Sequence, residues 1–154
     1  MCQYQATDGH IGPWHRAHLG AFATGAPGLI MVEATGVIPE GRISIGCTSI
    51  EDDAHANNFK EIIDFAHSLN VKMGIQLAHA GRKASTMRPW DDHRMATPAD
   101  GGWQATSSSA TAFEGYPTPR ALTTDEIKEL TQKFADAAKR AVKVGFDVIE
   151  IHAA

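Results

Sequence analysis

The sequence predicts an α/β fold built on a parallel β-sheet, and two observations support this prediction. The first is a set of nearly continuous apolar runs, rich in β-branched residues, at residues 29–37, 71–79 and 146–152. Such runs are typical of strands that are buried on both faces by covering helices. The second is the alternation of these runs with helical patterns, which predicts right-handed βαβ units.

Three segments have the apolar spacing of helices. Residues 13–24 predict a short helix that begins at a proline and ends before Gly25. Its expected inward residues are Trp14, Ala17, Leu19 and Phe22. Residues 58–69 predict an amphipathic helix. Residues 123–144 predict a longer one, because Thr123 and Glu126 fit a capping box and Gly145 fits the C-terminal cap.

A long segment without periodicity, residues 80–121, follows the second apolar run. Loops of this length inside a domain are usually lids or binding loops, or else disordered. Because the segment follows a strand, we expect it to lie at the carboxyl ends of the strands, where α/β proteins hold their ligands.

Composition excludes several classes of function. The net charge of -4 disfavours a nucleic-acid partner, since nucleic-acid-binding proteins usually carry a basic patch. Neither a membrane-spanning run nor a secretory signal is found in the sequence, so we expect a cytoplasmic protein without a membrane partner. Cys2 and Cys47 are expected to be thiols.

Polar residues end the three predicted strands and are the first candidates for a site. They are Glu33, Thr35, Gln76, His79, Glu150 and His152. A metal site is one alternative, with His15 and His18 three residues apart on a predicted helix. The sequence lacks the His and Cys spacings typical of metal sites, so we predict none. It also lacks a glycine-rich phosphate loop after any strand.

The string QLAHAGRKA at residues 76–84 resembles the third-strand motif of the Old Yellow Enzyme family of flavin-dependent ene-reductases. Other strings agree in the same order. MCQY at 1–4 resembles the end of the family's first strand, VEAT at 32–35 with PEGR at 39–42 its second strand and turn, and GFDVIEIHAA at 145–154 its fourth. Cys2 and the loop with Arg88, Pro89 and Trp90 make the chain similar to the thermophilic-like or xenobiotic-reductase branch.

The resemblance implies a partial (β/α)8 TIM barrel, from the loop after strand 1 through strand 4. Residues 1–154 would be a single incomplete FMN-binding domain, with 80–121 as the strand-3 loop or lid. NADPH or NADH would reduce the FMN, which would then pass hydride to an activated alkene, the expected small-molecule partner. Because the family's phosphate-binding strands are absent, we expect residues 1–154 alone not to hold FMN tightly. The sequence leaves a homo-oligomer open.

The resemblance also implies a role for individual residues. Cys2 would lie against the flavin and tune its potential or contact substrate, and Tyr4 would bond a substrate carbonyl. His152 would be half of a pair that stabilises negative charge on that carbonyl. Gln76 would pair with the flavin pyrimidine edge, which alternates donors and acceptors. The cofactor-binding residues it implies are Met1, Cys2, Ala34, Gln76 and His152.

Two other interpretations stay open from the sequence. The chain fits the flavin domain of an enzyme similar to dienoyl-CoA reductases, which a downstream cysteine cluster would distinguish. It also fits a truncated barrel fragment or assembly module without activity of its own. Arg82, Lys83, Trp90 and Trp103 fit contacts to the site and simple packing of the loop equally well.

Overall fold

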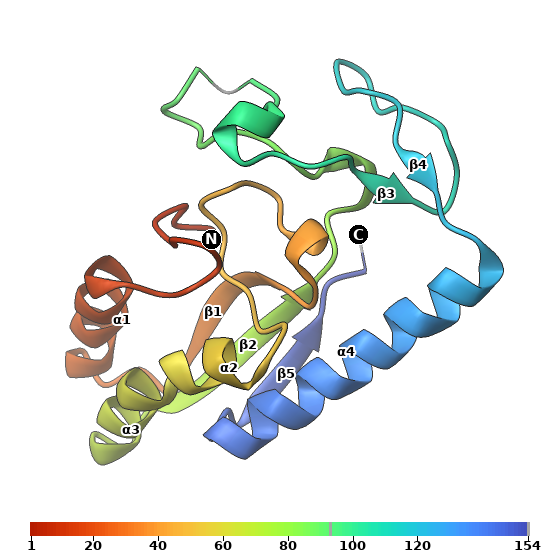
Figure 1. The fold of residues 1–154 in the computed structure, drawn as a ribbon. Helices are drawn as coiled ribbons and strands as arrows, with labels where there is room; N and C mark the ends of the chain where they lie inside the picture. Colours follow the sequence, from red (N-terminus) through yellow and green to blue (C-terminus); the bar gives the residue numbers. More distant parts are fainter. Residues whose placement is uncertain (93, 154) are drawn as a thin grey trace.

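The computed structural model describes residues 1–92 and 94–153 (Figure 1). At its centre is a parallel sheet in the order β1-β2-β5, formed by β1 (Leu29–Gly36), β2 (Lys72–Ala78) and β5 (Val148–Ile151). Each strand lies inside one of the predicted apolar runs, so the predicted parallel sheet is confirmed. In its register Ala34 lies opposite Gln76, and Gln76 lies opposite Glu150.

In the described part of the chain, four α-helices accompany the sheet: α1 (Pro13–Thr24), α2 (Asp53–Asn58), α3 (Lys60–Ser68) and α4 (Thr124–Val144). The core combines apolar side chains of the strands with those of α1, α3 and α4, including Val32, Ile75, Leu19, Ile63 and Ala141. No helix in the described part of the chain combines the length and apolarity needed to cross a bilayer.

The sequence did not predict α2, which Asp52 caps by accepting a hydrogen bond from the backbone N–H of His55. Phe59 separates α2 from α3 and is completely buried. The predicted helix at 58–69 is therefore the second of two consecutive helices, and it begins at Lys60.

The predicted inward face of α1 was wrong except at Leu19. The buried residues are His15, Leu19 and Ala23, whereas Trp14 and Phe22 are 53% and 52% exposed. The physical reason is that the polar side chain of His15 has a buried partner on β1, and this pairing fixes the rotation of the helix. Trp14 and Phe22 instead pack on either side of His18 on the outer face.

The caps of α4 confirm the prediction. The Thr123 hydroxyl accepts from the Glu126 N–H at 3.2 Å, and the Glu126 carboxylate accepts from the Thr123 N–H at 2.8 Å. Gly145 ends the helix with φ +111°, a backbone conformation that side chains disfavour.

Residues 80–92 and 94–121 lie in a loop over the carboxyl edge of the sheet (Figure 1). Its described residues include the short 3-10 turns η2 (Gly81–Lys83) and η3 (Pro98–Asp100). Two short parallel strands, β3 (Thr106–Ser107) and β4 (Arg120–Ala121), close it. The Trp103 indole N–H donates to the Glu40 carbonyl, in the turn η1 (Pro39–Gly41) after β1, at 2.9 Å. Its function as a lid stays a prediction.

Candidate active site

The predicted site residues of the sheet lie together at its carboxyl edge. Ala34 and Gln76 are partners across β1 and β2, and the backbone N–H of His152 donates to the Leu77 carbonyl at 2.9 Å. Three segments far apart in sequence thus meet at one edge. The His152 side chain itself is exposed.

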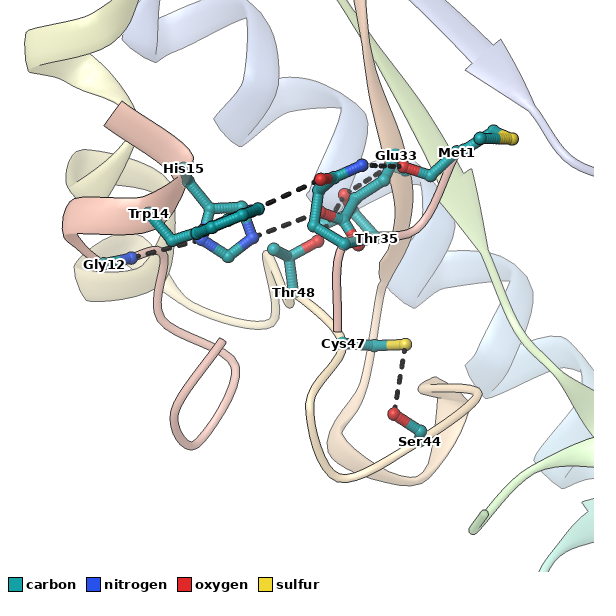
Figure 2. Close-up of polar contacts among 10 residues, drawn as sticks. Met1, Gly12, Trp14, His15, Glu33, Thr35, Ser44, Cys47 and Thr48 are labelled. Carbon is teal, nitrogen blue, oxygen red and sulfur yellow. Dashed lines mark hydrogen bonds and ion pairs between the residues drawn. The ribbon is translucent and has the colours of Figure 1, made fainter. Parts of the chain in front are cut away.

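The N-terminal segment reaches the same edge. The backbone N–H of Gln3 donates to the Glu33 carboxylate on β1 at 3.0 Å, and the Cys2 thiol lies near the backbone of Ala34. The segment that carries Cys2 and Tyr4 is therefore attached to β1 next to Ala34, and the roles of these two residues toward a flavin stay a prediction. The Met1 side chain is fully exposed and extends away from Glu33 (Figure 2).

The edge of the sheet offers donors and acceptors that suit a flavin ring. Gln76 is half-buried and lies opposite Ala34 in the register of β1 and β2. An amide carries both a donor and an acceptor, which matches the alternating pyrimidine edge of FMN. Beside it, Ala34 is a small side chain that permits close approach. These residues fit the cofactor.

Cys2 and Cys47 are both reduced, and their thiols are neighbours. The neighbouring Cys47, burial and the negative charge of Glu33 together raise the pKa of Cys2 far above its ordinary value. Cys2 is consequently a neutral thiol at physiological pH. Cys47, which comes from the loop after β1 and also contacts Ser44, was not predicted as part of the site.

Tyr4 has a left-handed backbone with φ +55°, which is unusual for a residue with a side chain. Its ring packs edge-on against Trp90 with centroids 6.1 Å apart. Burial raises the pKa of the Tyr4 hydroxyl, so this group is a hydrogen-bond donor at neutral pH.

Gly46 makes the conformation of Tyr4 possible. A Cβ atom at residue 46 would lie 2.5 Å from the Tyr4 carbonyl oxygen, closer than van der Waals contact allows. The Gly46 carbonyl in turn accepts a hydrogen bond from the Ala6 N–H at 2.9 Å. The N-terminal segment therefore lies directly on this loop.

Glu33 has a larger structural part than its sequence context suggested. Its carboxylate accepts from Gln3 and also from Nε2 of His15 at 3.1 Å, and Figure 2 shows the imidazole of His15 directed at it. A glutamate inside an apolar strand run needs buried partners. A glutamate within an apolar run was therefore the one sign of this structural role in the sequence, but the sequence does not identify its partners.

His79, by contrast, is not directed at the site. Its Nδ1 accepts from the Gly81 N–H at 3.0 Å, while its Nε2 is buried without a partner in the described residues. Burial lowers the pKa of His79, which is therefore neutral. Arg82 and Lys83 lie over the ring of Phe113, which places both on the loop surface.

Glu51, Asp52 and His55 bring three possible metal-ligand atoms within 4.8 Å of one another. Both ring nitrogens of His55 already have partners, however: the Asp52 carboxylate at 2.8 Å and the Asp8 carbonyl at 3.0 Å. These two hydrogen bonds explain the cluster as a helix cap that joins α2 to the N-terminal segment. His15, one residue of the alternative metal site, is occupied by Glu33.

Comparison with known proteins shows which sequence family and which relatives this chain matches. The model of the NADH:flavin oxidoreductase / NADH oxidase family matches residues 1–154. An NADH:flavin oxidoreductase of Gibberella zeae is 47% identical over 159 residues, which cover 100% of this chain and 38% of the relative. An NADPH dehydrogenase of Geobacillus thermodenitrificans is 43% identical and is covered to 42%. The chain thus spans about two fifths of the length of these relatives.

Solved structures agree with the fold. Morphinone reductase superposes with a TM-score of 0.80 at 29% identity, over 100% of this chain and 42% of that one. An Old Yellow Enzyme from Pichia sp. superposes with a TM-score of 0.79 at 22% identity, over 99% of this chain and 40% of that one. These similarities confirm the predicted partial (β/α)8 barrel.

Proposed function

The chain belongs to the NADH:flavin oxidoreductase / NADH oxidase family, and on this basis we propose that its protein is an FMN-dependent ene-reductase. NADPH or NADH would supply the hydride, and the substrate would be an activated alkene such as an α,β-unsaturated carbonyl compound. The observation that supports this best is the juxtaposition of Ala34 and Gln76 at the carboxyl edge of the sheet, with Cys2 next to Ala34.

The proposed residues have distinct tasks at this edge. Gln76 pairs with the pyrimidine side of FMN, Ala34 allows the ring to approach β1, and Cys2 presents a neutral thiol beside it. Bound FMN supplies hydride chemistry that no amino-acid side chain provides. Met1 is a weaker cofactor contact, because its side chain is fully exposed.

In this proposal, Tyr4 and His152 polarise the carbonyl group of the substrate. Donors aimed at a carbonyl oxygen stabilise the negative charge that develops when hydride reaches the β-carbon. Tyr4 has a protonated hydroxyl for this task. His152 follows β5 at the same edge, where its backbone is bonded to β2. The loop 80–121 would cover the bound substrate.

The test uses the protein that carries this chain, purified and incubated with FMN. We expect a bound flavin absorbance near the visible maximum of FMN, bleaching by NADPH without oxygen, and recovery on adding 2-cyclohexenone. Gln76→Leu should weaken FMN binding by about tenfold, the effect of losing a hydrogen bond of about 1.4 kcal/mol. Gln104→Leu, at an exposed position in the loop, is the control.

Two results would refute the proposal. One is a protein that neither binds added FMN nor oxidises NADPH. The other is a flavin that NADPH bleaches but that no activated alkene reoxidises. This result would agree with membership of the oxidoreductase family but would exclude the ene-reductase activity.

A further inference from the structure

Glu33 lies at an irregularity in β1. Val32 pairs with Ile75 and Ala34 pairs with Gln76 on consecutive residues of β2, so Glu33 has no partner in the ladder. Bulges of this kind redirect a side chain and are common next to active sites. Here the carboxylate is directed out of the sheet toward α1 and the N-terminal segment (Figure 2).

The hydrogen bonds of the bulge residue define its charge. Gly12 donates its backbone N–H to Nδ1 of His15 at 3.3 Å, so the proton of a neutral His15 is on Nε2 and is donated to Glu33. The second carboxylate oxygen accepts from the Gln3 N–H. Both oxygens act as acceptors, which makes Glu33 an anion with a side chain only 2% exposed.

The segment bound by this anion is the one that carries Cys2 and Tyr4. Gln3 stands between them, and the left-handed backbone of Tyr4 follows immediately. On the far side of Tyr4, the N–H of Ala6 is bonded to Gly46. The unfavourable backbone conformation is thus clamped between two hydrogen bonds to elements distant in sequence.

We propose that Glu33 is a positioning residue, whose buried carboxylate fixes the backbone of Cys2 and Tyr4 at the carboxyl edge of the sheet and places a negative charge beside the Cys2 thiol. The relevance of this position to catalysis rests on the proposed function. His15 and Gly12 are the supporting members, since they hold the carboxylate in one orientation.

The charge gives the proposal a readout that simple packing would not affect. Three titratable groups interact electrostatically with Cys2: Cys47 from the loop after β1, Glu33 from β1, and Tyr4 from its own segment. The negative charge of Glu33 is one of the causes that raise the pKa of Cys2, after burial and both effects of Cys47, its contact and its charge. Removing it must make Cys2 more acidic.

The experiment compares wild type with Glu33→Gln, which keeps the shape and removes the charge. Cys2 is alkylated with iodoacetamide between pH 6 and pH 10, and peptide mass spectrometry separates it from Cys47. We expect the rate profile of Cys2 to move to lower pH in Glu33→Gln. Glu51→Gln, which removes a carboxylate bonded to Ser49, should leave the profile unchanged.

Glu33→Asp provides a second, independent measurement. It keeps the charge but is too short to reach both Gln3 and His15, so backbone hydrogen exchange at Gln3 and Tyr4 should be at least tenfold faster than in wild type. An unchanged Cys2 profile in a folded Glu33→Gln protein would overturn the proposal. If that variant does not fold, unchanged exchange in Glu33→Asp would overturn it.

Both measurements are made on the protein with and without FMN. Neither depends on turnover, so a failure of the proposed ene-reductase activity would leave the alkylation and exchange results intact. A protein that reduces alkenes normally but shows no effect of Glu33 on Cys2 or Gln3 would reject only the positioning role.

Discussion

The carboxylate of Asp147 accepts a hydrogen bond from the backbone N–H of Met73 at 2.9 Å, which joins the segment before β5 to β2. His67 and Lys72 donate to the same carboxylate, at 2.7 and 2.9 Å. The bond from Met73 and the two side chains hold the pKa of Asp147 well below its usual range.

Asp147→Asn should therefore destabilise the protein. A hydrogen bond to a charged group contributes about 1.5–3 kcal/mol, and we expect a loss of that size in the free energy of unfolding at pH 7, measured with urea. Asp64→Asn, which breaks an exposed helix pair with Lys60, should cost about 0.5 kcal/mol or less.

The sign of the pH dependence follows from the lowered pKa of Asp147. Its contribution is fully present above the unfolded pKa of about 4 and is lost as the pH falls toward the folded value. The difference between wild type and Asp147→Asn should consequently shrink below pH 4. A difference that stays constant down to pH 3 would contradict the assignment.

His55 should have the opposite pH dependence. Burial alone would lower its pKa, but the bonds to the Asp8 carbonyl and the Asp52 carboxylate raise it above the ordinary value. Both partners are acceptors, so the ring satisfies both only as an imidazolium, stacked on His10 with centroids 3.9 Å apart. This stabilisation is complete below about pH 6.5 and is lost as the pH rises through the folded pKa.

His55→Gln tests this dependence. We expect it to lower the free energy of unfolding by about 1.5–3 kcal/mol at pH 5.5 and by clearly less at pH 8.5. His18→Gln is the control, because His18 packs between two aromatic rings and has no carboxylate partner in the described structure. An equal loss for His55→Gln at both pH values would be evidence against the imidazolium.

Gly46→Ala should be destabilising by about 1–3 kcal/mol, the usual cost of overpacking. Its new methyl group would meet the Tyr4 carbonyl oxygen and the Arg88 guanidinium, at 2.5 and 2.8 Å. Gly28→Ala is the matched control, since nothing lies within 4 Å of its Cβ position. The measurement is thermal unfolding, and equal melting temperatures for the two variants would refute the close contact.

The sheet and the long helices could be predicted because their signals are local. Apolar runs and helical periodicity mark them, and the cap of α4 depends only on Thr123, Glu126 and Gly145. The face of α1 could not be predicted in this way, because a pairing between His15 and a residue on β1 decides it. Apolar periodicity alone favours Trp14 and Phe22 for the same face.

The same difference separates the residues of the candidate site: the topology of the sheet places some of them, and the path of a loop places others. Ala34, Gln76 and His152 end strands of one parallel sheet, so topology alone brings them to one edge. The contact of Cys47 with Cys2 depends on the path of a loop, and loops have no such periodic rule. Where Cys2 and Tyr4 lie was implied by family resemblance, while the backbone of Tyr4 became apparent only in the structure.

The unpaired residue in β1 is absorbed by the strand without changing the faces of its later side chains. Val32 lies opposite Ile75 and Ala34 lies opposite Gln76, which are consecutive residues of β2, so Val32 and Ala34 occupy opposite faces of the sheet. Deleting Glu33 would therefore make the pairing with β2 regular and leave Ala34 and Thr35 on the faces that they occupy now. The deletion would remove only the carboxylate that binds Gln3 and His15, so the barrel strand would still form while the N-terminal segment would lose its attachment to it.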